Sequence, residues 1–393
     1  MSATTPPISR ARLAVLAVFA TNGLIMASWV SRVPTFRDRF TLADQQVGLV
    51  LLSVSAGAVL ALPATGAVIG RLGARTTVRL GCLVATVGLA IMALAPSTGL
   101  LWLLVAGMFA TGIGSGSWDV AMNVEAAEVE RRLGRSVMPH FHASFSIGTV
   151  AGALLGAGAN AVHVPVGVHL IVIAALCLVG TQLACFGFLP VVAAPAGTAA
   201  EHPRRHPLSA WTEPRVLAIG LLVLCFAFTE GSANDWLALG LVDGYHVSNA
   251  YGVAGFAVFV AAMTLGRMSG PFVLDRYGRV VVLRLTALCA AAGVLVVVFA
   301  GLPWALLGAA VWGLGASLGF PVGMSAGADD PARAAARVSV VSSIGYTAFL
   351  AGPPFIGFLA AHVGILHALL AVLAVLVVGA AAASATRPVA ARR

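Results

Sequence analysis

The feature that most constrains the fold is a set of very long stretches that contain no acidic or basic residue apart from histidine. Four of them run over residues 80–118, 136–200, 285–328 and 338–386. Each is longer than the about 20 apolar residues that one membrane crossing needs. Because backbone amides in lipid must be satisfied within their own segment, such stretches fold as helices joined by short turns. The sequence therefore predicts an all-α membrane protein that crosses the bilayer many times.

The overall composition argues against several other classes of protein. Charged residues make up 9% of the chain and hydrophobic residues 60%, compared with about 25% and 45–50% in soluble domains. The five cysteines lie in apolar segments without metal-ligand spacing, so we expect no disulfide, no metal and no cofactor. The polar residues are too dispersed for a catalytic set, so an enzyme is not expected. The formal charge of +9 comes from arginines in predicted loops, which argues against a nucleic-acid partner.

Splitting the apolar stretches at prolines, glycines and charged clusters gives twelve transmembrane helices. Their expected ranges are 12–33, 46–69, 76–95, 99–124, 138–161, 166–189, 214–240, 251–274, 280–300, 303–327, 338–360 and 365–385. A segment without apolar periodicity separates the sixth helix from the seventh. The predicted organisation is an N-terminal six-helix bundle (1–190), a linker (191–212) and a C-terminal six-helix bundle (213–393).

The arginines set the expected orientation. With the N-terminus placed inside, all but four of the 23 basic residues fall in loops on the inner side. Arg32, Arg37 and Arg39 fall outside, and Arg267 lies within a span. This asymmetry follows the positive-inside rule. We therefore expect a multi-pass protein of the cell (plasma, inner) membrane with both termini and the linker in the cytoplasm.

The two halves of the sequence repeat each other. The segment "GAVIGRLGARTTVRL" (66–80) matches "PFVLDRYGRVVVLRL" (271–285) at a constant offset, which pairs Gly73 with Gly278. Further along, Gly88 pairs with Gly293 at the same offset. Two related six-helix bundles with a site between them near the midplane are typical of secondary transporters. The fold class predicted is thus an all-α membrane protein of two pseudo-symmetric six-helix bundles.

These loop motifs resemble the cytoplasmic signature of the major facilitator superfamily. With twelve spans and a central linker, the resemblance covers the whole chain. Within the superfamily, "FTLADQQVGLV" (40–50), "GIGSGSWDVAMN" (112–123) and "TEGSANDW" (229–236) resemble the bacterial branch around the fucose permease and its uncharacterised inner-membrane relatives. The resemblance implies a solute transporter that alternates access to its site by rocking two bundles.

Asp119 and Asn123 are candidate binding residues on the fourth helix. Counting about 1.5 Å per residue from Gly99 places Asp119 about 30 Å along the helix, in its inner half. One interpretation is an interfacial acid paired with a loop arginine. The other is a protonatable carboxylate that faces a cavity, which the resemblance favours because that family carries an acid and an asparagine at this spacing. The acids beyond it, Glu125, Glu128 and Glu130, are expected to be solvated, with Glu128 paired to Arg131 or Arg132.

Glu230 is expected near the middle of the seventh helix, about 22 Å from its inner end. Asn234 shares its helical face. In the first half, Asn22 occupies the corresponding position, because "FATNG" (19–23) resembles "FAFTEG" (226–231). An inter-helix hydrogen bond would be a purely structural role for Asn22. The alternative is that Asn22, Glu230 and Asn234 contribute to a substrate and proton site at the depth expected for transporters.

A second group of residues is expected to control access. Trp29 and Arg32 on the first helix mirror Trp236 and Asp235 on the seventh, and we expect Arg32 and Asp235 to pair across the halves. The tryptophans are equally explained by the aromatic belt of membrane proteins. Arg267 lies within a span and needs a partner from another helix, either Asp119 or a cluster of carbonyls.

The signature-loop arginines would, by resemblance, latch the cytoplasmic ends of the two halves together: Arg71, Arg75, Arg276 and Arg279. In this signature an acid normally precedes the first arginine. Asp275 keeps that acid in the second half, whereas Gly70 replaces it in the first half. The first latch is therefore expected to be the weaker one.

The sequence predicts a proton-coupled secondary transporter of a small molecule, acting as a monomer in the lipid bilayer. The resemblance to the sugar permease favours symport of a sugar-like or polar metabolite. However, Val30 stands where sugar transporters of that branch carry an acid, and "GTVAGALLG" (148–156) resembles the fifth-helix motif of antiporters. Proton-antiport efflux of a drug or metabolite is therefore the alternative.

Overall fold

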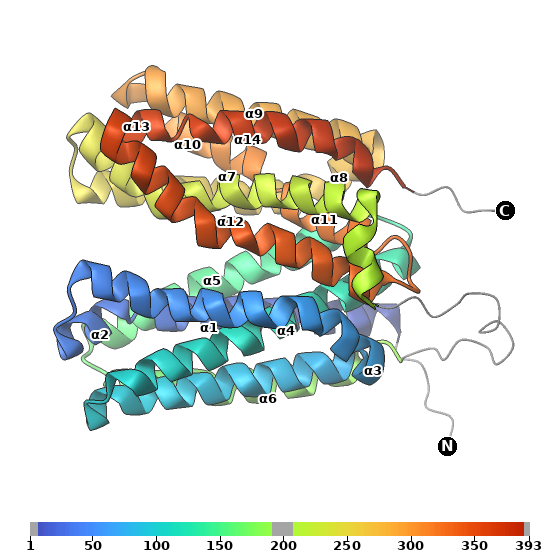
Figure 1. The fold of residues 1–393 in the computed structure, drawn as a ribbon, viewed down its shortest axis with the longest axis horizontal. Helices are drawn as coiled ribbons and strands as arrows, with labels where there is room; N and C mark the ends of the chain where they lie inside the picture. Colours follow the sequence, from blue (N-terminus) through green and yellow to red (C-terminus); the bar gives the residue numbers. More distant parts are fainter. Residues whose placement is uncertain (1–6, 191–206, 389–393) are drawn as a thin grey trace, which may run out of the picture. The chain divides into compact units, whose positions relative to one another are not determined.

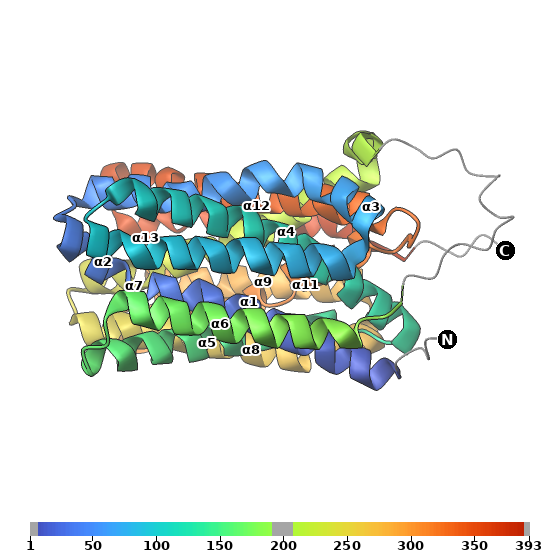
Figure 2. The ribbon, with the colours of Figure 1, turned by 90° about the horizontal axis from the view of Figure 1, so that it is seen from below.

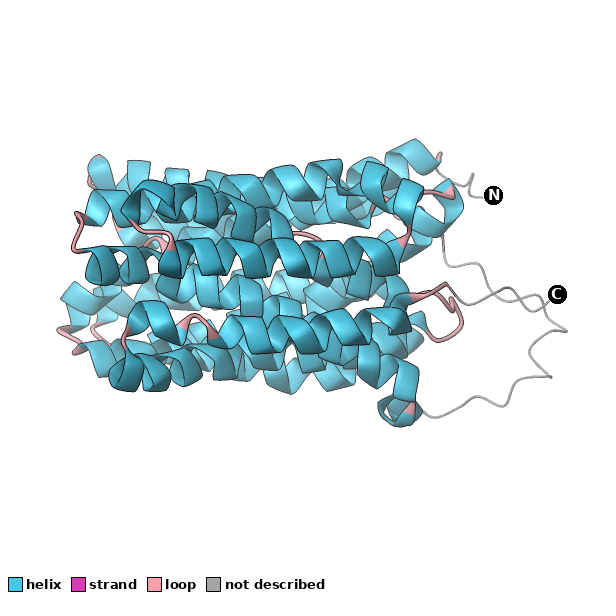
Figure 3. Cartoon of the chain, turned by 90° about the horizontal axis from the view of Figure 1, so that it is seen from above, coloured by secondary structure: helices cyan, strands magenta, loops and turns pink. Residues whose placement is uncertain are grey.

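The computed structural model describes residues 7–190 and 207–388. Within this part of the chain every regular element is helical and no strand is present (Figures 1 and 3). Most of the expected linker, residues 191–206, lies outside the described residues. Its last part forms a short 3-10 helix, η2 (Pro207–Thr212). The predicted all-α fold class is confirmed.

The described helices are long and apolar enough for a multi-pass membrane protein. Eleven helical segments within the described residues meet the length and hydropathy of a membrane span. One of them, α3 (Asp44–Thr98), has 55 residues and contains a kink at Gly73. At about 1.5 Å per residue this helix is long enough for two crossings. It takes the place of the expected helices 46–69 and 76–95, so the segments agree with twelve crossings.

The chain divides into two compact units by its internal contacts. Unit 1 comprises Met1–Gly134, Ser144–Glu213 and Pro331–Ser339. Its helices are α1 (Ile8–Val30), α2 (Val33–Phe40), α3, α4 (Leu101–Leu133), most of α5 (Met138–Ala161) and α6 (Val166–Ala184), which continues into η1 (Cys185–Gly187). Helices α3 and α4 run side by side along their length, as Figure 2 shows, and α6 packs against α3 and α1. Small residues allow this close approach, as described below for Gly88.

Unit 2 comprises Arg135–Ala143, Pro214–Asp330 and Val340–Arg393. Its helices are α7 (Pro214–Tyr245), α8 (Asn249–Tyr277), α9 (Arg279–Phe299), α10 (Leu302–Ala316), α11 (Gly319–Gly327), most of α12 (Ala334–Val363), α13 (Ile365–Ala368) and α14 (Ala371–Ala382), followed by η3 (Ala383–Thr386). Helix α10 packs against α8 and α9, and α14 packs against α7 and α9.

The sequence repeat reappears in the backbone of the two units. Gly73 in unit 1 has φ 78° and ψ 160°, and Gly278 in unit 2 has φ 76° and ψ 162°. Residues with a Cβ essentially never adopt this combination of angles. Both signature loops therefore make the same sharp turn, and glycine is required at both positions.

The second pair of matched glycines also has equivalent surroundings. A Cβ on Gly88 would lie 2.6 Å from both the carbonyl oxygen of Gly107 and the amide of Thr111. A Cβ on Gly293 would lie 2.8 Å from the carbonyl oxygen of Gly308 and 2.2 Å from the amide of Trp312. Backbones this close need small residues, as is common between membrane helices. The predicted pseudo-symmetry of the two bundles is confirmed.

The expected tenth helix, 303–327, is broken in the structure. Helix α10 ends at Ala316 and α11 begins at Gly319. The break has a sequence cause, because Pro321 has no amide hydrogen to donate to the carbonyl four residues earlier, on Ser317. That carbonyl oxygen is left available to another donor.

Candidate functional site

The most deeply buried charged pair of unit 2 joins helices α7 and α8. Nη2 of Arg267 lies 2.9 Å from Oε2 of Glu230, and the side chains are 5% and 15% exposed. Charged groups inside membrane segments are expensive unless they are paired or face a cavity. The pairing accounts for the presence of both charges in otherwise apolar helices.

The helix break near Pro321 supplies the second contact of this arginine. Nε of Arg267 donates a hydrogen bond to the carbonyl oxygen of Ser317 at 3.3 Å. We expected a partner for Arg267 on another helix, either Asp119 or a carbonyl cluster, and the structure provides Glu230 together with this carbonyl. Asp119 belongs to unit 1, so a pairing with it stays a prediction.

Three further residues of the α7 motif lie one to two turns beyond Glu230. Asn234 and Asp235 are exposed within the described structure. Trp236 is half-buried, and a Cβ on Gly357 of α12 would lie 3.2 Å from its indole ring. The indole Nε1 of Trp236 is buried and has no hydrogen-bond partner among the described residues. Asn234, Asp235 and Trp236 thus place an amide, a carboxylate and an indole N–H at three consecutive positions of α7.

The candidate binding residues of unit 1 gather around α4. Asn123 is fully buried, and its Nδ2 donates to the backbone carbonyl of Asp119 at 2.9 Å and to the Asp119 carboxylate at 3.4 Å. Asn22 on α1 is 5% exposed, and its Nδ2 lies 3.9 Å from the sulfur of Met122. The three predicted residues thus lie on two adjacent helices of the same unit. Their roles in binding stay a prediction.

Arg32 forms hydrogen bonds with residues of its own unit. Its side chain is 1% exposed, with Nη1 3.1 Å from Oδ1 of Asn160 and Nη2 bonded to the carbonyl oxygen of Val164. Trp29, one turn earlier, is also buried. The expected pair of Arg32 with Asp235 would join residues of different units and stays a prediction.

In unit 1 two arginines of the segment 66–80 lie beside one aromatic ring. The guanidinium carbons of Arg75 and Arg79 lie 5.2 Å and 4.6 Å from the ring centroid of Phe186. Contacts of this length are cation–π interactions. Arg71 is exposed, and Gly70 beside it has open space where a Cβ would stand.

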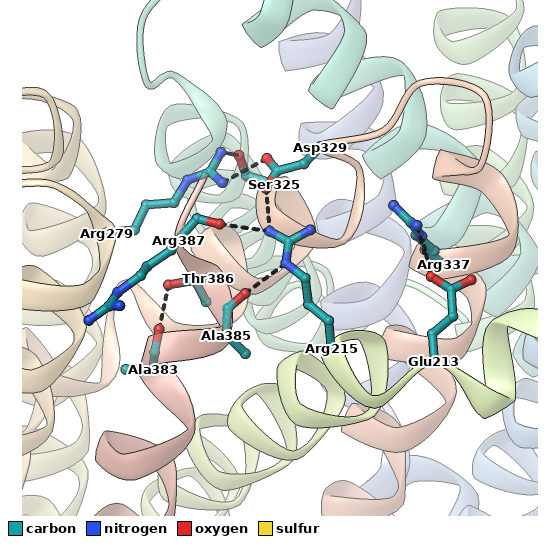
Figure 4. Close-up of polar contacts among 10 residues, drawn as sticks. All are labelled: Glu213, Arg215, Arg279, Ser325, Asp329, Arg337, Ala383, Ala385, Thr386 and Arg387. Carbon is teal, nitrogen blue, oxygen red and sulfur yellow. Dashed lines mark hydrogen bonds and ion pairs between the residues drawn. The ribbon is translucent and has the colours of Figure 1, made fainter. Parts of the chain in front are cut away.

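In unit 2 the same loop is held by carboxylates. Oδ1 of Asp275 accepts a hydrogen bond from the backbone amide of Ser136 at 2.9 Å, just before α5 begins. Arg279 lies 2.7 Å from a carboxylate oxygen of Asp329 and 2.7 Å from the hydroxyl of Ser325 (Figure 4). Arg276 is exposed and stacks over Tyr277.

Sequence reasoning missed the acid at the centre of this cluster. Asp329 also binds Arg215, with 2.6 Å between the second carboxylate oxygen and Nη2, so one carboxylate holds two arginines (Figure 4). In unit 1, Glu213 pairs in the same way with Arg333 and Arg337. The available signal was the position of these acids next to loop arginines, which were used only to assign the orientation of the helices.

The expectation that Glu125 is solvated is wrong. Its side chain is 6% exposed, and Oε1 accepts a hydrogen bond from the backbone amide of Leu189 at 2.7 Å. The chain leaving η1 turns back over α4 and covers the carboxylate. The expected pairing of Glu128 with Arg131 and Arg132 is confirmed, at 2.6 Å and 2.7 Å.

A multi-pass helical fold with two matching units and a buried intramembrane ion pair is typical of membrane transporters. The sequence pattern of the Major Facilitator Superfamily matches residues 13–346. The chain belongs to this superfamily and is a transporter rather than an enzyme.

Proteins of similar sequence support this assignment. The chain is 33% identical to the uncharacterized transporter y4wD of Sinorhizobium fredii over 371 residues, covering 92% of this chain and 96% of that protein. It is also 33% identical to an uncharacterized MFS-type transporter of Yersinia pestis, covering 91% of both chains. The membrane protein MosC of Rhizobium meliloti is 28% identical, covering 94% of this chain and 88% of that protein.

Solved structures share the fold. The transporter FucP in its outward conformation superposes with a TM-score of 0.81 at 15% identity, covering 96% of this chain and 98% of that one. The human organic anion transporter MFSD10 has a TM-score of 0.75 at 18% identity, covering 96% and 100%.

Proposed function

We propose that the chain is a proton-coupled secondary transporter in which Glu230 exchanges the proton. The observation that carries this proposal is the Glu230–Arg267 pair, the one intramembrane carboxylate–guanidinium contact shown within unit 2 among the described residues. A carboxylate that takes up a proton no longer neutralises the guanidinium beside it. With the counter-charge of Glu230 removed, a polar or anionic solute or a rearranged helix competes for the guanidinium of Arg267. Proton binding and conformation become linked through this contact.

The direction of transport that we propose rests on the sequence resemblance to the fucose permease branch. Symport of a sugar-like or polar metabolite is the first choice, in line with FucP, described as a fucose:proton symporter, which shares the fold. We place solute binding at Asn22, Asp119 and Asn123 in unit 1 and at Glu230 and Asn234 in unit 2. The other predicted residues would control access to this site: Trp29, Arg32, Asp235, Trp236, Arg267, Asp275 and the signature-loop arginines.

Antiport is the second candidate, and one observation favours it. A Cβ on Gly148 would lie 2.0 Å from the carbonyl oxygen of Ala20, and one on Gly152 would lie 2.6 Å from that of Leu24. The "GTVAGALLG" segment therefore packs α5 directly onto α1. This segment resembles the helix motif of antiporters, although Ala153 replaces its proline.

Proton flux in proteoliposomes tests the proposal. Purified protein is reconstituted with an internal pH indicator, and gradients of sugars, organic acids and drugs are applied in turn. A solute that drives protons in its own direction identifies symport, and one that drives them oppositely identifies antiport. The Glu230→Gln variant should lose solute-driven proton flux, whereas Glu128→Gln, which alters an ion pair at the end of α4, should keep it. Coupled flux that persists in Glu230→Gln removes this residue from the mechanism.

A further inference from the structure

The second buried arginine of the structure, Arg32, lies without a carboxylate. It is 1% exposed and within 4.0 Å of no acidic oxygen among the described residues. Its two hydrogen-bond acceptors, Asn160 and the carbonyl of Val164, are both neutral. A buried charge without a counter-charge is strongly destabilising. A negatively charged ligand beside this guanidinium would therefore stabilise the fold.

Holding the loop between α5 and α6 uses only two of the three guanidinium nitrogens of Arg32. Nη1 donates to the side-chain oxygen of Asn160 in the last turn of α5, and Nη2 donates to the carbonyl of Val164 in the loop that leads to α6. The third nitrogen, Nε, is buried and has no hydrogen-bond partner in the described structure. One donor of Arg32 is left over.

His169 supplies a second unsatisfied donor beside it. Its side chain is 6% exposed, and neither ring nitrogen has a partner among the described residues. Every imidazole carries at least one N–H, and a buried donor without an acceptor is costly.

The local packing brings these groups together at one place. The position of a Cβ on Gly156 would lie 1.8 Å from the hydroxyl of Ser31, the neighbour of Arg32, and 3.6 Å from Cε1 of His169. Because Gly156 has no side chain, α5 approaches both the end of α1 and the first turn of α6 at this point. His169 lies in the first turn of α6, where backbone amides and the helix dipole also favour negative charge.

We propose that Arg32, His169 and the N-terminus of α6 bind a small monovalent anion. The ligand is either a halide or the carboxylate of a small organic acid, because both accept hydrogen bonds from Nε and from an imidazole N–H. The near-complete burial of Arg32 excludes a bulky anion. The site lies within unit 1 and does not depend on proton coupling at Glu230.

Thermal unfolding of the full chain in lipid nanodiscs tests the proposal. Gluconate is replaced by chloride, bromide or acetate at constant ionic strength, and the unfolding midpoint Tm is followed by tryptophan fluorescence. We expect a saturable rise in Tm that Arg32→Gln abolishes. In His169→Phe the half-saturating concentration should rise about ten-fold, as expected for a lost hydrogen bond to a charged group. A response to halides alone identifies an inorganic ion, and a response to acetate alone identifies a carboxylate.

Two control variants show whether the anion response belongs to this site. Arg39→Gln alters an exposed arginine that binds the carbonyl of Pro96, and it should keep the full anion response. Asp235→Asn removes the acid that the sequence suggested as the partner of Arg32, and the response should survive there too. An equal response in wild type, Arg32→Gln and Arg39→Gln overturns the proposal.

If Arg32→Gln fails to fold, the bromide ion itself gives the answer. Anomalous scattering from crystals of wild-type protein grown in bromide should place the ion beside Nε of Arg32 and the ring of His169. A water molecule refined there in bromide-grown crystals, with no anomalous signal, overturns the proposal, since one water can satisfy both donors.

Discussion

Glu230 on α7 and Arg267 on α8 hold each other at 2.9 Å, with both side chains largely buried. Removing one member of such a pair leaves an uncompensated charge, which costs about 3–5 kcal/mol in buried sites. We expect Glu230→Ala and Arg267→Ala each to lower the unfolding temperature strongly. The double variant should recover part of the loss, with a coupling free energy of about 1–3 kcal/mol.

The measurement is a double-mutant cycle by thermal unfolding in one detergent. The matched control is the pair of Glu128 and Arg131, which has side chains 26% and 54% exposed. Pairs of this kind on a helix surface contribute only about 0.5 kcal/mol. Coupling of equal size in both cycles would show that the intramembrane pair is no stronger than a solvated one.

Asp329 is expected to be the most sensitive residue of the cluster at the end of unit 2. Its carboxylate is 13% exposed and binds both Arg215 and Arg279. Asp329→Asn removes the charge that holds two guanidinium groups together, and we expect a loss of about 1–3 kcal/mol of stability.

The control for this variant is Asp243→Asn, which changes an exposed aspartate of α7. A surface change of that kind should stay within about 0.5 kcal/mol. Unfolding midpoints measured at low and high salt separate the two, because a half-buried cluster is screened less than an exposed charge. Equal midpoints for the two variants would contradict a central role for Asp329.

The glycines at 278 and 134 allow a test in which only the backbone is strained. Gly278 and Gly134 both have open space around a Cβ, so a new side chain meets no neighbour at either position. Gly134 has φ 64° and ψ 21°, a left-handed conformation that asparagine tolerates. Gly278 has φ 76° and ψ 162°, which is nearly exclusive to glycine.

The same substitution should therefore give different results at the two positions. We expect Gly134→Asn to change stability by a few tenths of a kcal/mol and Gly278→Asn to cost about 1–3 kcal/mol. Unfolding midpoints of the two variants decide the matter. Similar midpoints would mean that the signature loop relaxes into another conformation.

The pattern of the sequence predicted the fold because lipid leaves few alternatives. Runs without charge require helices, and the matched loops around Gly73 and Gly278 indicate the duplication by their residue order alone. The two conformations agree to within a few degrees. Such features depend on local sequence, so they can be derived from it.

Contacts between helices could not be derived in the same way. A membrane helix is apolar on all sides, so its sequence does not indicate which face meets which neighbour. The partner of Arg267 depended on a helix break at Pro321 and on the rotation of α7. Likewise, Glu125 is covered by the chain that follows α6, which is distant in sequence.

Gly70 offers a way to restore the acid that the first signature loop lacks. One turn earlier on α3, a Cβ on Gly66 would lie 2.9 Å from the carbonyl oxygen of Ala335 in the first turn of α12. Gly70 itself is exposed, with nothing near its Cβ position. A carboxylate there would lie near the N-terminus of α12, where the helix dipole stabilises negative charge by about 0.3–1 kcal/mol.

We therefore expect Gly70→Asp to be more stable than Gly70→Asn, which has the same shape without the charge. The comparison removes the benefit that any residue other than glycine brings to a helix, about 0.5–1 kcal/mol for alanine. The difference in unfolding midpoint between the two variants should shrink as salt is raised, because exposed charges are screened. If Gly70→Asp and Gly70→Asn unfold together at low salt, the carboxylate does not reach α12. The missing acid would then have no bearing on how this end of unit 1 is held.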